Sequence, residues 1–86
     1  MILFKYKKYV GTIEFDDNNE FYGHVLGLKN TIISYEGSNV NELKYDFQDG
    51  IDNYLEDCHV NGEEPEKVNK KLAKSEWNDI FSNSLA

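Results

Sequence analysis

The sequence has few of the features that are typical of secreted proteins. Cys58 is the single cysteine among 86 residues, so no disulfide can form within the chain and a disulfide-stabilised secreted scaffold is excluded. The apolar start of the chain, residues 1–4, is too short for a signal peptide or a membrane span, and lysines follow it. We therefore expect a cytoplasmic protein without a membrane segment.

Positive charge is also scarce. Nine basic residues stand against 16 acidic ones, which gives a net charge of −7. Binding to a nucleic acid requires a basic surface that displaces counterions, so this balance disfavours a nucleic-acid partner. An acidic protein is better suited to a basic protein partner, because complementary potentials speed association and select partners. Solubility alone is the alternative explanation for the negative charge.

The chain has enough apolar side chains to fold, but only as one domain. Hydrophobic residues make up 40% and aromatic residues 14% of the sequence, which is typical of a globular protein. A chain of this length can bury one small core. We expect the core-forming part to be residues 1–65, followed by a tail over residues 66–86.

Three segments in the first half of the chain have the pattern of β-strands. Residues 9–16 (YVGTIEFD), 21–28 (FYGHVLGL) and 31–36 (TIISYE) are rich in β-branched and aromatic residues, and the first alternates with period two. Only two to four residues separate consecutive segments, so neighbouring strands must be antiparallel. Gly23 and Gly27, inside the second segment, predict a bulge or a close approach by another backbone or ring.

A long amphipathic helix is predicted over residues 40–60. Asn39 is a suitable N-cap, Glu42 completes a capping box, and Gly62 follows the last turn. The polar side is acidic: the segment 40–58 contains one lysine and six carboxylates, a net charge of −5. The apolar positions share one side at helical spacing: Val40, Leu43, Phe47, Ile51, Tyr54, Leu55 and Cys58.

The tail has a weaker pattern. Residues 67–74 contain four lysines and are compatible with a fourth strand, although a solvated linker is the alternative. Ser75 is a suitable cap for a short C-terminal helix whose apolar side contains Trp77, Ile80, Phe81 and Leu85. The predicted fold is therefore α+β: a three-stranded antiparallel meander, one long amphipathic helix, a fourth strand as an option, and a short C-terminal helix.

This order of elements resembles the HicB antitoxin family of bacterial toxin-antitoxin pairs. The resemblance covers residues 9–67, which are 59 of the 86 residues. It rests on an ordered set of segments and not on one motif: YVGTIEFD, FYGHVLGL, TIISYEGSNVNEL, DNYLEDC and NGEEPEK. The resemblance implies a partial RNase H-like domain in the β-β-β-α order.

The resemblance also implies a function. Such antitoxins mask a small basic HicA-like toxin, an mRNA endoribonuclease, by direct contact. Many relatives continue into a ribbon-helix-helix or helix-turn-helix segment that binds operator DNA. The tail 66–86 has no recognisable DNA-binding domain, and this departure puts DNA binding in doubt. An orphan HicB-like interaction domain, self-associating and without a toxin partner, is the second hypothesis.

The residues that could carry chemistry do not form a catalytic pattern. Glu14, Asp16 and Glu36 lie near strand ends, where a metal-dependent nuclease would hold its carboxylates, but solvated acids are the favoured interpretation. Cys58 and His59 with the distant His24 lack the paired spacing of a zinc site, and Cys58 lies on the apolar side of its helix. We therefore expect no enzyme activity, no metal and no cofactor.

Two alternative surfaces are candidates for the partner. One is the acidic side of the helix, and the other is a side of the sheet that a single helix cannot cover. Because large bare apolar surfaces are uncommon on monomers, the tail, a second copy or a partner must cover that side, and a homodimer is one of the expected states. The candidate contact residues are Tyr22, His24 and Leu26 on the sheet, and Asp46, Asp49, Asp52 and Glu56 on the helix.

Overall fold

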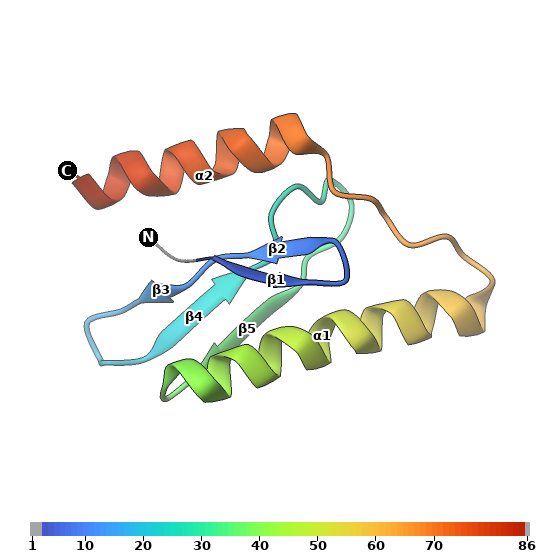
Figure 1. Ribbon diagram of the computed structural model, residues 1–86, viewed down its shortest axis with the longest axis horizontal. Helices are drawn as coiled ribbons and strands as arrows, with labels where there is room; N and C mark the ends of the chain where they lie inside the picture. Colours follow the sequence, from blue (N-terminus) through green and yellow to red (C-terminus); the bar gives the residue numbers. More distant parts are fainter. Residues whose placement is uncertain (1–2, 86) are drawn as a thin grey trace.

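Two helices lie on opposite sides of a layer of short antiparallel strands (Figure 1). The structure, a computed structural model, describes the backbone of residues 3–85 and the side chains of residues 3–79. The strands β3 (Glu14–Phe15), β4 (Phe21–His24) and β5 (Ser34–Gly37) form a sheet in the order β3-β4-β5. The helices are α1 (Val40–Asn61) and α2 (Lys70–Leu85). The predicted α+β fold, with an antiparallel meander before a long helix, is confirmed.

A hairpin at the start of the chain was not predicted. It consists of β1 (Phe4–Tyr6) and β2 (Tyr9–Gly11), paired antiparallel. The two residues of its turn, Lys7 and Lys8, both have left-handed backbone, with φ of 47° and 72°. Such turns normally contain Asn or Gly, which adopt this conformation at little cost. The sequence signal of a hairpin is therefore missing here.

The first predicted strand, residues 9–16, is interrupted at Thr12. Its carbonyl oxygen accepts a hydrogen bond from the hydroxyl of Tyr35 (2.8 Å). The Thr12 hydroxyl in turn accepts from the backbone N–H of His24 (3.1 Å). Side-chain hydrogen bonds thus replace part of the ladder at this point, and the chain continues as two short strands, β2 and β3.

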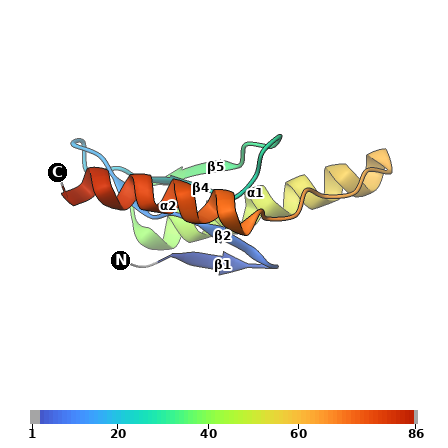
Figure 2. The ribbon, with the colours of Figure 1, turned by 90° about the horizontal axis from the view of Figure 1, so that it is seen from above.

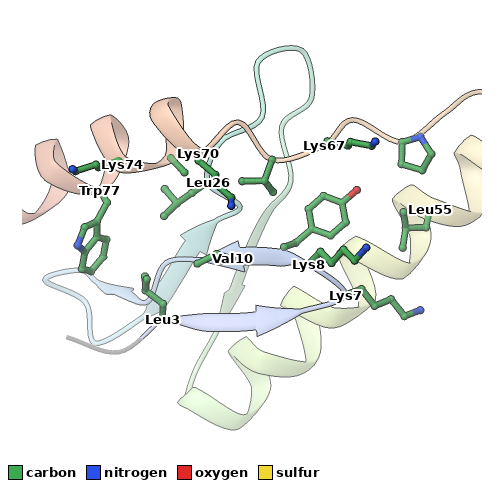
Figure 3. A pocket seen from close by; sticks show the side chains of 14 residues that line it. Leu3, Lys7, Lys8, Val10, Leu26, Leu55, Lys67, Lys70, Lys74 and Trp77 are labelled. Atoms are coloured by element: carbon green, nitrogen blue, oxygen red, sulfur yellow. The ribbon is translucent and has the colours of Figure 1, made fainter.

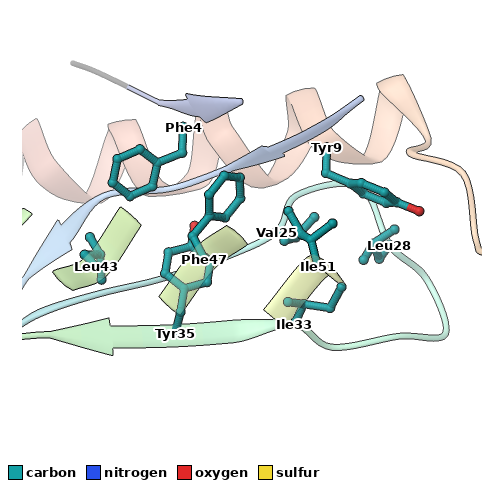
Figure 4. Packing of buried hydrophobic residues seen from close by; sticks show 9 residues of the cluster. All are labelled: Phe4, Tyr9, Val25, Leu28, Ile33, Tyr35, Leu43, Phe47 and Ile51. Atoms are coloured by element: carbon teal, nitrogen blue, oxygen red, sulfur yellow. The ribbon is translucent and has the colours of Figure 1, made fainter. Parts of the chain in front are cut away.

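The core lies between the strands and α1 (Figure 4). The rings of Phe4 and Tyr35 pack on Phe47, with centroids 5.2 and 5.1 Å from it. Gly11 and Gly23 face these rings, and a Cβ atom on either would overlap Tyr35. The close approach predicted at Gly23 is confirmed. The cluster comprises Phe4, Tyr9, Val25, Leu28, Ile33, Tyr35, Leu43, Phe47 and Ile51.

The predicted ends of α1 are confirmed. Asn39 Oδ1 accepts from the N–H of Glu42 (2.9 Å), and Glu42 Oε2 accepts from the N–H of Ser38 (2.9 Å), which completes the capping box. Gly62 has a φ of 68° and donates its N–H to the last turn. Cys58 is buried, as predicted.

The tail is a longer helix than predicted. α2 begins at Lys70, so residues 70–74 are helical and Ser75 lies inside the helix; the described residues contain no fourth strand in the segment 67–74. Asn69 caps the helix, because its Oδ1 accepts from the N–H of Leu72 (3.0 Å). The side chains of Ile80, Phe81 and Leu85, predicted to share a side with Trp77, lie outside the described residues.

Glu66 attaches the tail to the rest of the protein. Its carboxylate accepts hydrogen bonds from the backbone N–H groups of Lys29 and Asn30. Its own N–H donates to the Tyr54 hydroxyl (2.8 Å), and its carbonyl accepts from the Tyr9 hydroxyl (3.0 Å). The hydrogen bonds to the charged carboxylate lower the pKa of Glu66.

From there α2 runs across the strands on the side away from α1 (Figure 2). The backbone N–H of Asn69 donates to the carbonyl of Gly27 (2.8 Å), and the N–H of Gly27 donates to the Glu76 carboxylate (2.7 Å). Gly27 has a φ of 80°, which allows the chain to turn beneath the helix. Over residues 3–85, neither helix has both the length and the apolar composition needed to cross a bilayer.

Candidate protein-binding surfaces

The first half of α1 and the neighbouring strand β5 form an acidic surface. Five residues line a shallow depression there and define this surface: Glu36, Glu42, Tyr45, Asp46 and Asp49. Asp46 joins the two elements, because its Oδ2 accepts from the backbone N–H of Glu36 (3.0 Å). Tyr45 stands between the carboxylates with 77% of its surface exposed. Four acids around one exposed aromatic ring are therefore presented on one surface.

The sheet extends this acidic surface through Tyr22. In the β4–β5 pairing Tyr22 lies opposite Glu36, and the two line a second depression together with Asp46. Tyr22 is 42% exposed. The sequence suggested the helix and the sheet as alternative surfaces, but the structure brings Tyr22, Asp46 and Asp49 into one continuous region.

Asp52 and Glu56 lie further along α1, outside the depressions that define the acidic surface. Asp52 is engaged by the β1–β2 hairpin: Lys7 Nζ lies 2.8 Å from its Oδ1, and the Tyr6 hydroxyl donates to the same carboxylate. The Lys7 ammonium lowers the pKa of Asp52, and the carboxylate raises the pKa of Lys7. Glu56 is exposed. Asp52 thus has a structural partner within the chain.

The remaining two predicted contact residues lie beneath or beside α2. Leu26 is only 2% exposed, so its placement on an exposed sheet surface is corrected. The physical reason is that the tail itself covers this side of the strands, which was one of the three predicted ways of screening it. His24 is partly exposed between two carboxylates: its Nδ1 lies 3.6 Å from Glu14, and its Nε2 lies 4.0 Å from Glu76.

Two of the three acids considered for a metal-dependent nuclease, Glu14 and Asp16, have local structural roles. Glu14 accepts a hydrogen bond from the Thr12 hydroxyl (2.9 Å). Asp16 Oδ1 accepts from the backbone N–H groups of Asn18 and Glu20 and thereby closes the β3–β4 turn. In the part of the chain that the structure describes, no three His, Cys, Asp or Glu side chains are grouped closely enough to hold one metal ion.

A groove lies between α2, β2 and the second half of α1 (Figure 3). Its volume is about 770 Å³. The floor and walls are mainly apolar, and lysines surround the opening. Apolar and aromatic residues of this lining include Tyr9, Val10, Leu26, Leu55, Val68 and Trp77, and the lysines are Lys7, Lys8, Lys67, Lys70 and Lys74.

Sequence reasoning missed this groove. The lysines of the tail were assigned to a linker, and Lys7 and Lys8 lie near the opposite end of the chain. The helical spacing of Lys70, Lys74 and Trp77 was the only available signal, since residues three or four apart share one side of a helix. This spacing alone does not show what the three side chains face; the position of α2 over β2 in the structure does.

Comparisons of the chain with protein-family models, with curated proteins and with solved structures give no match. The resemblance to HicB antitoxins therefore stays a prediction, and the surfaces described above are the basis for any functional proposal.

Proposed function

We propose that this protein is an antitoxin-like protein that binds and masks a small basic HicA-like mRNA endoribonuclease. The observation that carries the proposal is the acidic surface with its exposed ring of Tyr45. A cytoplasmic site of action is part of the proposal, and it agrees with a single cysteine that is buried.

Charge supports a basic partner. Within the described residues, no lysine lies within ion-pairing distance of Glu36, Glu42, Asp46 or Asp49, and the one lysine ion pair on α1 belongs to Asp52. All four of these acidic residues are exposed. A basic partner would approach faster in their field and would gain new ion pairs on contact.

The aromatic residues support a protein partner rather than general solvation of the surface. Tyr45 is 77% and Tyr22 is 42% exposed, although both carry large apolar rings. Tyrosines surrounded by polar groups often dominate the binding energy of protein interfaces. The combination of two such rings and the four acids matches a docking site for a basic, partly apolar surface.

Co-expression tests the proposal. The protein is expressed with a short basic endoribonuclease encoded next to its gene, and growth rescue and co-purification are measured. The double variant Asp46→Asn and Asp49→Asn removes two charges, while the amide oxygen introduced at position 46 remains an acceptor for the Glu36 N–H. We expect this variant to weaken binding by about tenfold or more and to lose the rescue.

The matched control is Glu63→Gln with Glu64→Gln, which removes two charges from exposed residues of the connector after α1. This control should bind and rescue like the unmodified protein. If both double variants lose binding equally, net charge and not the acidic surface determines the interaction. If the unmodified protein neither rescues growth nor co-purifies with the toxin, the proposal is wrong.

The alternative is an orphan HicB-like interaction domain that self-associates. It predicts a homodimer of the isolated protein at micromolar concentration and no effect on any neighbouring ribonuclease. Sedimentation equilibrium of the purified chain, together with the rescue experiment, separates the two functions.

A further inference from the structure

The groove has a charge opposite to that of the rest of the protein. The chain contains 16 acidic and nine basic residues, yet five of its lysines line this one groove and none of the described carboxylates does. The groove also shares no residue with the acidic surface. The molecule is therefore bipolar, with an acidic surface on α1 and a basic, apolar groove beneath α2.

Four of the five lysines have no acidic partner among the described residues. Lys7 is paired with Asp52, but no described carboxylate lies within 4.0 Å of Lys8, Lys67, Lys70 or Lys74. Lys5, Lys29, Lys44 and Lys71 likewise have no described ion pair, so what distinguishes the groove is that five of the nine lysines line it and no described carboxylate does. Unpaired ammonium groups around an apolar surface are complementary to a ligand that is apolar on one side and anionic at its edges.

Lys8 provides independent support. It occupies a turn position with a φ of 72°, where Asn or Gly would be more stable than lysine. The side chain is exposed, lines the groove and makes no ion pair with the described residues. An unfavourable residue at a position without a structural partner is typical of a functional requirement.

The arrangement of the lysines indicates the shape of the ligand. Lys7 and Lys8 stand on the hairpin side of the groove, whereas Lys67, Lys70 and Lys74 stand on the side of the connector and α2 (Figure 3). Cations thus border both edges of an apolar floor. A fatty acid has one carboxylate at one end and would use only part of this arrangement. An amphipathic helix with acidic residues on both flanks of its apolar stripe would use all of it.

We propose that this groove binds an acidic amphipathic helix of a partner protein. The apolar stripe of that helix packs against Val10, Leu55 and Trp77, which are partly exposed in the groove, and its flanking carboxylates pair with the lysines on both edges. This second binding site is independent of the acidic surface, so a single molecule could hold a basic and an acidic partner at the same time.

The probe is a synthetic peptide of about 18 residues, or about 27 Å as a helix. It carries leucines at i, i+3, i+4 and i+7, glutamates on both flanks, and a fluorescent label. The full chain is titrated into the peptide, and anisotropy is recorded. Trp77 is the only tryptophan, so its emission reports directly on the groove in a parallel experiment with unlabelled peptide. We expect saturable binding and a blue shift of Trp77 emission.

Matched variants locate the binding site. Lys74→Glu changes a groove lysine, and Lys71→Glu makes the same charge change at an exposed position of α2 that does not line the groove. We expect Lys74→Glu to weaken peptide binding by about tenfold or more and Lys71→Glu to change it by less than about threefold.

Lys8→Asn separates binding from folding. Asparagine favours the left-handed backbone at this position, so this variant should be at least as stable as the unmodified protein. It nevertheless removes one edge cation, and we expect it to weaken peptide binding. A variant that folds better and binds worse cannot be explained by a structural role of Lys8.

Several results would overturn the proposal. One is a Trp77 emission that stays unchanged at saturation, and another is equal binding of a peptide with lysines in place of the glutamates. Equal losses for Lys74→Glu and Lys71→Glu would indicate a nonspecific charge effect.

A shift of Trp77 emission with protein concentration alone would assign the groove to a second copy of the chain, and a stronger shift with polyuridine RNA would assign it to a nucleic acid. None of these results bears on the Asp46 and Asp49 variants, so the two proposals fail separately.

Discussion

The hydroxyl of Tyr35, in β5, donates a hydrogen bond of 2.8 Å to the backbone carbonyl of Thr12. Thr12 lies between β2 and β3, where the first predicted strand is interrupted. Burial raises the pKa of Tyr35, so the hydroxyl stays protonated and remains a donor throughout the neutral range. The same hydroxyl also lies 3.3 Å from the carbonyl of His24. The His24 carbonyl also accepts from the backbone N–H of Thr12 (3.0 Å), so the Thr12 carbonyl is the group for which the Tyr35 hydroxyl is the donor.

Removing this hydroxyl should destabilise the protein. In Tyr35→Phe the ring still fills the core, but the Thr12 carbonyl loses its hydrogen bond in a buried position. We expect the free energy of unfolding to fall by about 1–3 kcal/mol. Urea denaturation measures this change. Tyr45→Phe is the control, because Tyr45 is 77% exposed, and its stability should be unaffected. Equal stability of the two variants would mean that the Tyr35 hydrogen bond contributes nothing.

Gly11 should not tolerate a methyl group. A Cβ atom there would overlap the Tyr35 hydroxyl and the Phe47 ring. We expect Gly11→Ala to lower the free energy of unfolding by about 1–3 kcal/mol through overpacking.

Gly50→Ala is the matched control for Gly11→Ala. Gly50 lies in α1, and a Cβ atom there would meet only Ile33, at 3.2 Å. This contact is tight, but alanine is the better helix former by about 1 kcal/mol, which offsets it, so Gly50→Ala should be close to neutral. Thermal unfolding of both variants checks the difference in size, and a loss of similar size in both would contradict the predicted packing at Gly11.

Acid should weaken the attachment of the tail at Glu66. Hydrogen bonds from the backbone N–H groups of Lys29 and Asn30 lower the pKa of Glu66 below its ordinary value of 4.5. A carboxyl whose pKa is lower in the folded state stabilises the protein fully above its unfolded pKa. This contribution is lost as the pH falls below about 4.5 and through the folded pKa.

Comparison with Glu66→Gln isolates this effect. The melting temperatures of the protein and of the variant are measured from about pH 7 to about pH 3 in low salt. We expect the unmodified protein to be the more stable one at neutral pH, and the difference to shrink as the pH falls below about 4.5. A difference that stays constant over this range would show that ionisation of Glu66 does not contribute.

The cap at Asn69 should hold the first turn of α2. Asn69→Ala removes the acceptor for the Leu72 N–H, and we expect a loss of about 1 kcal/mol with fraying of this turn. Hydrogen exchange of the backbone amides of residues 70–74 and the emission of Trp77 measure the change. Asn78→Ala, at a position inside α2, is the control and should leave both signals as they are.

The elements predicted correctly are those determined by residues close together in the chain. α1 was predicted over residues 40–60 and is observed at Val40–Asn61, because Asn39, Glu42 and Gly62 form caps from neighbouring backbone groups. The β3–β4 turn likewise depends on Asp16 and the polar residues that follow it. Both signals are local, and both elements form as predicted.

The errors have long-range causes, apart from the missed hairpin, where a local signal is absent. The first predicted strand is broken because the hydroxyl of Tyr35, 23 residues further along the chain, donates a hydrogen bond to the Thr12 carbonyl. The β1–β2 hairpin was missed because Lys7 and Lys8 give no turn signal. The second predicted strand does not continue to residue 28, because Gly27, with a φ of 80°, turns beneath α2, where its carbonyl accepts from the backbone N–H of Asn69.

The sequence by itself determined the acidic charge of α1, the ends of that helix and the antiparallel order of the strands, since each depends on composition or on neighbouring residues. Only the tertiary structure decided that Tyr22 joins Asp46 on one surface, that Leu26 is buried, and that five lysines from both ends of the chain surround one groove. The physical reason is that side chains distant in sequence meet only when strand register and helix placement are fixed, and both are set by packing of the whole core.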